Sequence, residues 1–357
     1  MKKRFISKCL LVAMIAVLAG FFACQADAGA KAKYNWRLSS PWTRPIMVKI
    51  YTDFVNRVEK YTDGEVKIKV YPDGTIGNME ESFKSVQLGD IEISQTAPYV
   101  DVVPGGGISF IPWAVSSYAE YEKAFDIDNG IVHKVLTKAY DEVGMKVIFH
   151  VTTGGYGLSN NVREIKTPAD LKNIRFRVSS SKGVVMALGN MGKGTGMTME
   201  TIPMSEVYNS LSRKVIDGCW NSIGSITAER LYEVMKYHTE LNWFWDASQV
   251  SMNKDLWEEL PKNIQDGILK AARESQKYAT KLQKESDAKG LETIKKNGMK
   301  VYFPTAQEKE AFFKASNVEA VWNEILGPWL NKAYPNENMV KKIQAELAAN
   351  RKKLAAK

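Results

Sequence analysis

The fold of this chain is best inferred from one stretch, Thr167-Pro168-Ala169-Asp170-Leu171-Lys172-Asn173-Ile174-Arg175-Phe176-Arg177-Val178. Its first four residues are typical of a helix start. The threonine hydroxyl can cap, proline fits the first turn, and an acid three residues after the cap can bond back to it. A short helix is therefore predicted to begin at Thr167.

The second half of this stretch is predicted to form a strand. Alternation places Arg175 and Arg177 on one face and the apolar residues beside them on the other. The strand leads through three serines into a helical pattern, so Arg177 lies near a strand end that feeds a helix. Small ligands bind at such strand ends in open α/β sheets. Arg177 is thus a candidate ligand contact, although an exposed arginine is more often a solvated surface charge.

Later segments complete a pattern that resembles a known family. A helix is predicted over 203–211, and a strand ending in a turn over 215–222. The order "TPADLKNIRFRV", "PMSEVYNSLSRKVIDG" and a turn carrying Asn resembles the extracytoplasmic solute-binding proteins of tripartite ATP-independent periplasmic (TRAP) transporters, the DctP-like family. The similarity continues in "FVNRVEKYTDGEVKIKVYPDGTIGNMEESFKSVQLGDIEI" and in "SMNKDLWEELPKNIQDGILKAA", and so covers nearly the whole mature chain.

The resemblance implies an α/β fold of the two-lobed periplasmic-binding-protein type. Each lobe would be a mixed sheet flanked by helices, and a long helix would cross both lobes. With 357 residues, of which 45% are hydrophobic, the chain is long enough for two lobes with separate cores.

The first residues are predicted to be a secretory signal peptide, so the mature protein would be periplasmic. Four basic groups precede an uncharged apolar run over 9–23, and Ala26-Asp27-Ala28 offers small residues for cleavage. The run is shorter than the roughly 20 residues of a membrane span. We predict cleavage after residue 28; an uncleaved anchor and a lipidated Cys24 are the alternatives.

Removal of residues 1–28 changes the charge and the cysteine count. The formal net charge falls from +9 to +6, which suits anionic solutes or simply aids solubility. Only Cys219 remains, so no intramolecular disulfide can form, and a lone thiol in a strand is more often a small core residue than a nucleophile.

The mature chain opens with alternating strands and helices. Strands are predicted over 34–38, 66–70 and 91–95, with helices between them, and this β-α-β-α-β order implies a parallel sheet with right-handed crossovers. Thr152-Thr153-Gly154-Gly155 is the hinge candidate, because glycine accepts the changed backbone angles that closure requires.

We predict lobe 1 over 29–153, lobe 2 over 154–240, a return to lobe 1 over 241–281, and lobe 2 with C-terminal helices over 282–357. A helix of about 37 residues is expected over 261–297, with Gly290 as a potential interruption. One closing helix is expected through Phe312 and Trp329, followed by a solvated Lys-rich terminal helix.

The resemblance assigns roles to two polar residues. In the family, the second basic residue of the "K/R-x-R-V" strand forms a bidentate pair with the ligand carboxylate, and Arg177 matches it, whereas Arg175 is expected to be a structural charge. Asn221 matches an asparagine that hydrogen-bonds the same carboxylate or a nearby polar group; a turn role is its alternative.

Other positions bear on the ligand's body. The chain departs from the family at Trp220 and Ser222, which flank Asn221, and at Gly155, where relatives that bind a second acidic group can carry arginine. Taken singly, a large apolar residue is more often part of the hydrophobic core than of a ligand pocket. Taken together, the tryptophans at loop or strand-end positions suggest an apolar pocket wall that suits a flat ligand. The further pocket positions that we predict are Met204, Trp42, Trp243 and Tyr156.

The function predicted from these residues is capture of a small organic carboxylate for TRAP membrane subunits, with a monocarboxylate of aromatic or apolar body favoured. A C4-dicarboxylate binder and a sensory binding protein are the alternatives. An enzyme is least favoured, because the three histidines form no metal-spaced cluster, no Gly-x-Ser-x-Gly elbow exists, and the glycines at 192–196 fail the phosphate-loop pattern. No cofactor, no metal and no nucleic acid partner is predicted.

Overall fold

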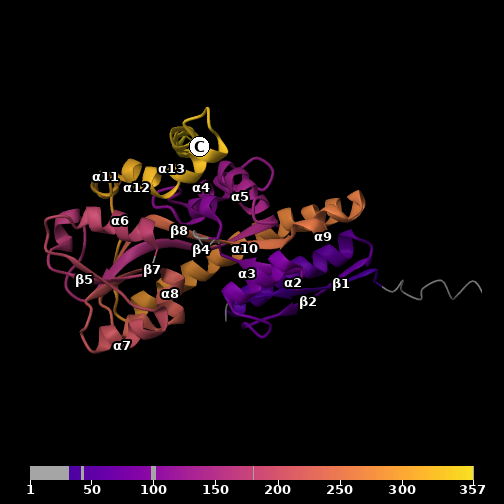
Figure 1. The fold of residues 1–357 in the computed structure, drawn as a ribbon. Helices are drawn as coiled ribbons and strands as arrows, with labels where there is room; N and C mark the ends of the chain where they lie inside the picture. The colour runs from indigo at the N-terminus through magenta and orange to yellow at the C-terminus, as the bar shows by residue number, and fades with distance from the viewer. Residues whose placement is uncertain (1–31, 42–43, 98–101, 180, 357) are drawn as a thin grey trace, which may run out of the picture.

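The computed structural model describes residues 32–41, 44–97, 102–179 and 181–356. These residues form a nine-stranded mixed sheet in the order β2-β1-β3-β8-β4-β7-β5-β6, with β9 beside β8, and helices flank it on both sides (Figure 1). The strands are β1 Tyr34–Ser39, β2 Val66–Tyr71, β3 Ile93–Thr96, β4 Met145–Asn160, β5 Arg175–Val178, β6 Thr198–Thr201, β7 Gly218–Ser222, β8 Tyr237–Asn253 and β9 Lys300–Tyr302. The predicted signal peptide and Trp42 lie outside the described residues.

The helices follow the apolar periodicity of the sequence. They are α2 Pro45–Tyr61, α3 Met79–Leu88, α4 Tyr118–Ala124, α5 Ile131–Asp141, α6 Lys182–Met191, α7 Val207–Ser212, α8 Ile223–Ala228, α9 Lys254–Glu258, α10 Lys262–Lys296, α11 Ala306–Ala315, α12 Val318–Ile325, α13 Gly327–Ala333 and α14 Met339–Ala355. Short 3₁₀ helices are η1 Pro104–Phe110, η2 Pro168–Leu171, η3 Met204–Glu206 and η4 Leu231–Glu233.

The opening β-α-β-α-β unit is confirmed. β1 pairs in parallel with both β2 and β3, and the helices between them cross from strand to strand. The capping box at Thr167 and Asp170 is also present, but the turn that it starts is the 3₁₀ helix η2 rather than an α-helix.

Two long antiparallel strands, β4 and β8, join the two halves of the molecule. The predicted hinge residues 152–155 lie inside β4, where Gly154 has φ +87° and the pairing with β8 shifts register between Thr152 and Gly155. The backbone is therefore irregular at the predicted hinge, but the chain there is strand rather than loop. The lobe boundaries remain a prediction.

The long predicted helix is present as the single helix α10. It packs against α2 of one half and α8 of the other, and Figure 1 shows it running diagonally across the molecule. Gly290 does not interrupt it. A side chain at Gly290 would meet Ile223 and Thr227 of α8 at 2.8 and 2.9 Å, so glycine lets the two helices approach closely.

The C-terminal region differs from the prediction. The single closing helix expected through Phe312 and Trp329 is three helices, α11 to α13, because Asn317 takes a left-handed conformation (φ 49°) and Gly327-Pro328 starts a new helix. The expected solvated tail, α14, buries Met339, Val340, Ile343 and Leu347 against its neighbours, which include α4 and α5.

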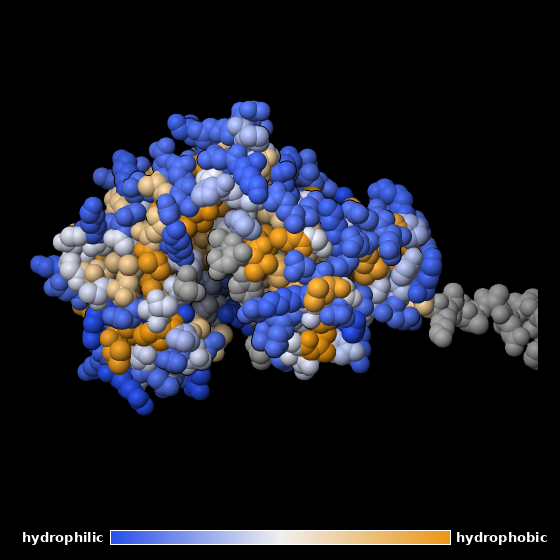
Figure 2. Space-filling view, viewed as in Figure 1, coloured by the Kyte–Doolittle hydropathy of each residue, from blue (hydrophilic) through white to orange (hydrophobic). Residues whose placement is uncertain are grey.

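Each half has a hydrophobic cluster of its own, as expected from chain length, but the largest cluster is shared between the halves. The largest hydrophobic cluster extends from Phe83 to Leu347 and includes side chains from both sides of the predicted hinge. A second cluster lies between β1, α2 and the first half of α10, and a third lies around α7, α8 and β7. The surface is hollowed between the half that carries α7 and α8 and the half that carries α2 and β2 (Figure 2).

Candidate functional site

Arg177 is a buried guanidinium that lacks an acidic partner among the residues the structure describes. It lies on β5 with 8% of its surface exposed, and its Nε donates a 2.7 Å hydrogen bond to the carbonyl oxygen of Ile202. Burial lowers the pKa of the Arg177 side chain from its usual value, while nearby Cys219 and Tyr156 oppose that shift. A cation that has lost its water and gained no carboxylate is a strong site for an anion.

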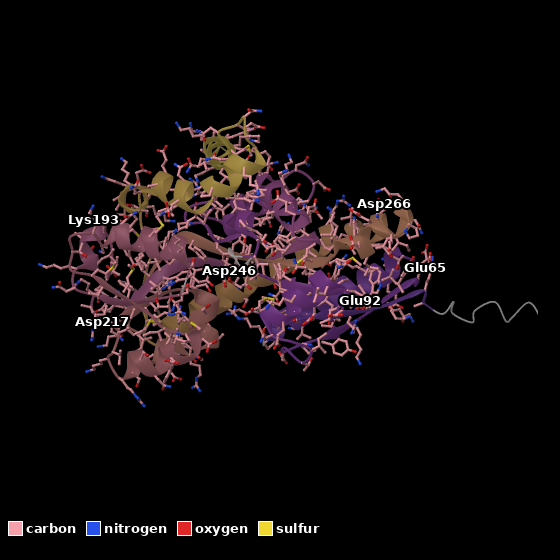
Figure 3. All side chains as sticks on the ribbon, viewed as in Figure 1. Glu65, Glu92, Lys193, Asp217, Asp246 and Asp266 are labelled. Carbon is pink, nitrogen blue, oxygen red and sulfur yellow. The ribbon has the colours of Figure 1, made fainter. Side chains whose placement is uncertain are left out.

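Arg175, two residues earlier on the same strand, has a different environment. Its guanidinium forms two hydrogen bonds with Asp217, at 2.9 Å from Nε and 2.8 Å from Nη2, and it is exposed. This contact lowers the pKa of Asp217, which is labelled near the outer end of β5 in Figure 3. Arg175 is thus a structural charge, as the sequence predicts.

Asn221 lies within β7 rather than in the turn after it. Its side chain is buried, with Oδ1 accepting from Ser159 Oγ at 2.9 Å and Nδ2 donating to Cys219 Sγ at 3.1 Å. Arg177 pairs in register with Cys219 across β5 and β7, and its charge opposes the rise in the pKa of that thiol. Arg177 and Asn221 are therefore both neighbours of the same cysteine.

Three aromatic rings pack together next to these polar groups. The ring of Tyr156 lies 4.8 Å from that of Trp220 and 5.2 Å from that of Phe244, and Trp220 and Phe244 are 4.7 Å apart. Tyr156 is only partly buried, whereas Trp243 has no exposed surface and lies behind Trp220 at 6.3 Å. In this conformation Tyr156 offers accessible aromatic surface, and Trp243 supports the cluster from the core.

Asp246 is a polar group that the sequence analysis missed. It lies on β8 and is labelled near the centre of the molecule in Figure 3; its Oδ2 accepts from Thr153 Oγ1 at 3.3 Å and, more weakly, from Tyr156 OH at 3.5 Å. Burial raises the pKa of Asp246 to about 6, although the charge of Arg44 opposes the shift. The feature of the sequence that could have pointed to Asp246 is an acidic residue within the largely apolar run of residues 241–250.

The remaining predicted positions are more peripheral or more constrained. Met204 begins η3 and is partly buried against the cluster around α7. A Cβ atom at Gly155 would lie 1.7 Å from Asn242 Oδ1 and 3.1 Å from Trp245 Cε2, so a larger residue there would have to displace Asn242. An arginine at this position is therefore incompatible with the present side-chain arrangement.

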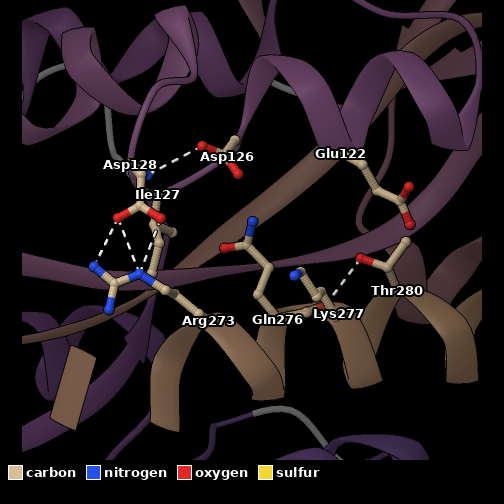
Figure 4. Close-up of a pocket in the computed structure, with 8 residues that line it drawn as sticks. All are labelled: Glu122, Asp126, Ile127, Asp128, Arg273, Gln276, Lys277 and Thr280. Atoms are coloured by element: carbon tan, nitrogen blue, oxygen red, sulfur yellow. Dashed lines mark hydrogen bonds and ion pairs between the residues drawn. The ribbon is translucent and has the colours of Figure 1, made fainter. Parts of the chain in front are cut away.

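Other features of the described residues lie apart from this site. A cavity of about 400 Å³ is lined by residues of α4, the α4–α5 connection and α10, Asp128 and Arg273 among them, and by none of the predicted contacts (Figure 4). Within the described ranges, no three His, Cys, Asp or Glu side chains are placed to hold a metal. None of the helices described combines the length and hydropathy that crossing a membrane requires.

Known proteins resemble this chain over most of its length. The sequence model of the family described as bacterial extracellular solute-binding protein, family 7 (DctP), matches residues 41–326. The 2,3-diketo-L-gulonate-binding periplasmic protein YiaO of Escherichia coli is 26% identical over 317 residues, with 88% of this chain and 92% of that protein covered. The C4-dicarboxylate-binding periplasmic protein DctP of Rhodobacter capsulatus is 27% identical, with 83% of each chain covered.

Solved structures agree in fold. A TRAP periplasmic solute-binding protein from Ochrobactrum anthropi superposes with a TM-score of 0.81 at 22% identity, covering 90% of this chain and 97% of that one. Another from Desulfovibrio salexigens, with bound orotic acid, gives a TM-score of 0.73 at 25% identity, covering 89% and 99%.

Proposed function

The chain belongs to family 7 of the bacterial extracellular solute-binding proteins, the solute-binding proteins of TRAP transporters, and from this premise we propose that it captures a small organic monocarboxylate between its two halves. The family consists of binding proteins rather than enzymes. Members work with membrane subunits that move the solute, so the transporter is the partner that we infer.

The observation that carries the proposal is the buried Arg177 without a carboxylate partner among the described residues. Its planar guanidinium matches the two oxygens of a carboxylate and keeps its charge when buried. In this proposal Asn221, which also contacts Cys219, supplies an amide that hydrogen-bonds the same group. In this proposal the ligand carboxylate serves as the counter-ion of Arg177.

The body of the ligand is inferred from the aromatic cluster. Tyr156 and Trp220, with Trp243 near them, suit a flat or apolar group, since offset or edge contacts between aromatic rings add about 0.5–1.5 kcal/mol per pair beyond area burial. Gly155 has no room for a second arginine while Asn242 keeps its place. A second ligand carboxylate buried without a partner would cost several kcal/mol. The Desulfovibrio salexigens relative was solved with orotic acid, a flat monocarboxylate.

A C4-dicarboxylate is the second candidate. The Rhodobacter capsulatus relative carries that description, and one relative from Sulfurospirillum deleyianum was solved with succinate. In this chain the charge of Arg44 acts on both Asp246 and Tyr156, so a second cation is near the cluster. A ligand with two carboxylates would then bind with its ends at Arg177 and Arg44.

The proposal is tested by identifying the solute and by comparing acids. Native mass spectrometry of the purified mature protein should show a bound organic acid. In a thermal-shift panel, aromatic and branched monocarboxylates, orotate among them, should raise the melting temperature, and succinate, malate and fumarate should not. Stabilisation by a C4 diacid alone would favour the second candidate, and no response to any carboxylate would contradict the proposal.

We also infer that residues 1–28 are removed on export and that the mature protein acts in the periplasm. The inference rests on the basic and apolar pattern of the first residues and on the extracellular family. N-terminal sequencing of the exported protein should begin near Gly29. A start at a lipidated Cys24, or a retained Met1, would contradict it.

A further inference from the structure

A chain of buried hydrogen bonds leads from Asn221 to a carboxylate on β8. Ser159 Oγ on β4 lies 2.9 Å from Asn221 Oδ1 and 2.7 Å from His238 Nδ1. His238 Nε2 in turn lies 2.8 Å from Glu240 Oε2. All four side chains are buried. The proposed ligand contact Asn221 is thus connected, over three hydrogen bonds, to the buried pair His238 and Glu240.

The sheet register brings these residues together. Ser159 pairs with Cys219 of β7 on one side and with His238 of β8 on the other, so the chain of hydrogen bonds passes straight across three adjacent strands. Gly157 leaves room for the imidazole: a Cβ atom there would lie 2.7 Å from His238 Cε1 and 3.0 Å from His238 Nε2. The histidine ring therefore lies over the backbone of β4, where only glycine permits it.

Two neighbours indicate which end of the Asn221 amide is nitrogen in this structure. The ends have nearly the same shape, so the hydrogen-bond network decides their placement. Cys219 donates its only hydrogen to Met235 Sδ at 3.8 Å, which leaves Cys219 Sγ as an acceptor for Nδ2 of Asn221. Ser159 donates to Oδ1 at the other end. The second hydrogen of Nδ2 has no acceptor among the described residues and is left for a ligand oxygen.

A count of hydrogens extends this orientation to His238 and Glu240. Ser159 has one hydroxyl hydrogen, which goes to Asn221, so His238 must donate from Nδ1. A second hydrogen has to lie between Nε2 and Glu240, because a nitrogen lone pair would repel a carboxylate oxygen at 2.8 Å. The pair therefore holds two hydrogens. If the pair held only one hydrogen, His238 Nδ1 would accept from the hydroxyl of Ser159. Asn221 would then turn its side-chain nitrogen to Ser159, and its carbonyl oxygen would face the ligand.

We propose that His238 and Glu240 are positioning residues for the ligand site: through Ser159 they hold Asn221 with an N–H, rather than its carbonyl oxygen, toward a ligand carboxylate beside Arg177. The inference rests on the proposed function. The nearby titratable groups on other elements are Tyr118 of α4 and Asp287 of α10, which interact electrostatically with Glu240, and Cys219 and Arg177 beyond Ser159.

The first test reads the hydrogens of His238 directly. Long-range ¹H–¹⁵N spectra of the ¹⁵N-labelled mature protein are recorded with sodium acetate, the smallest carboxylate probe, and with sodium chloride at equal ionic strength. Acetate should shift the side-chain signals of Arg177 and Asn221, and His238 should carry hydrogen on Nδ1 in the acetate-bound protein. Hydrogen on Nε2 alone in that state would overturn the inference.

Variants supply the second test. Ser159→Ala removes the link between His238 and Asn221 and should weaken acetate binding about tenfold, in line with the loss of an oriented hydrogen bond to a charged group. Ser251→Ala is the matched control, because Ser251 is also a buried hydroxyl of the central strands but bonds to Thr96 at 2.8 Å instead. It should change acetate affinity less than twofold.

The role of Glu240, at the far end of the hydrogen-bond chain, is tested by whether a conservative substitution restores acetate affinity. Glu240→Leu leaves Nε2 of His238 without a partner and should weaken acetate binding, whereas Glu240→Gln restores a hydrogen-bonding group and should recover most of the affinity. Urea unfolding of each variant confirms that the protein is folded. If Ser159→Ala binds acetate within twofold of wild type while Arg177→Ala does not bind, the positioning role is wrong and the proposed function stands. If wild type does not respond to acetate or to any panel carboxylate, the proposed function itself fails.

Discussion

Arg177 and Arg175 are two residues apart on one strand, yet the structure gives them opposite environments. Arg177→Ala should lower affinity for the cognate carboxylate by at least thirtyfold, since truncating one member of a buried charge pair costs about 2–5 kcal/mol. Arg177→Lys should recover only part of this, because an ammonium group does not reproduce the planar fork. Isothermal titration calorimetry with the acid identified by mass spectrometry gives the measurement.

The matched control is Arg175→Ala. Arg175 pairs with Asp217 at the exposed side of the strand, so its removal should change affinity less than threefold, under about 0.7 kcal/mol. The assignment of the clamp fails if Arg177→Ala also stays within that limit.

Asp287 provides a residue-level prediction of pH dependence. It accepts hydrogen bonds from Tyr118 and Gln283, and burial raises its pKa to about 7, compared with about 3.9 in an unfolded chain. The folded state therefore binds this proton more tightly, and the contribution of Asp287 to the free energy of unfolding falls as pH rises from about 4 to 7. Asp287→Asn should thus gain stability relative to wild type across that window.

The measurement is urea unfolding of both proteins at several pH values between 4.5 and 7.5. Burial lowers the pKa of His133 to about 4, so its stabilising contribution is lost as pH falls from about 6.5 toward 4. This contribution is common to both proteins, so the difference between their curves of unfolding free energy against pH reports Asp287 alone. Asp266→Asn, at an exposed carboxylate of the same helix, is the control. A difference curve for Asp287→Asn that is flat with pH would refute the prediction.

At the level of single elements, α10 contains a glycine that contacts backbone. A Cβ atom at Gly267 would lie 2.5 Å from the carbonyl oxygen of Tyr61 at the end of α2. Alanine normally favours a helix interior by about 1 kcal/mol over glycine, but here overpacking should dominate. Gly267→Ala should therefore lower the free energy of unfolding by about 1–3 kcal/mol.

Gly183, in α6, serves as the matched substitution. A Cβ atom at Gly183 would make only ordinary contacts, the nearest 3.4 Å from Pro112 Cδ, so Gly183→Ala should be neutral or stabilise by up to about 1 kcal/mol. The change in the free energy of unfolding is measured for both variants by urea unfolding. Equal effects of the two substitutions would mean that helix propensity, not the α2 contact, sets the result.

The elements that the sequence predicts well are those with long, regular periodicity. The opening parallel unit and α10 follow from apolar spacing alone, and the strand end at Arg177 follows from alternation. The division of the C-terminal region was missed, because apolar spacing continues across Asn317 and Gly327 and conceals the breaks. The Ser159, His238 and Glu240 chain was also missed, since strand register brings together residues that lie far apart in the sequence.

At the scale of the whole molecule, one hydrophobic cluster and one sheet extend through both halves. Local loss of either half would expose the apolar surface of the other, so the mature protein should unfold in a single cooperative transition. Differential scanning calorimetry should show one peak with agreeing calorimetric and van't Hoff enthalpies, moving to higher temperature with ligand. Two separate peaks, of which only one moves with ligand, would indicate independent lobes.

The order of strands in the sheet also affects how the protein is made. β8 lies between β3 and β4, so residues up to the end of β4 cannot complete their sheet until the chain has been synthesised through residue 253. Pairings between segments so distant in sequence form slowly. If the chain is exported as we propose, the residues before β8 would reach the translocation channel before their sheet can close. Strand order would then favour threading of an incompletely folded chain.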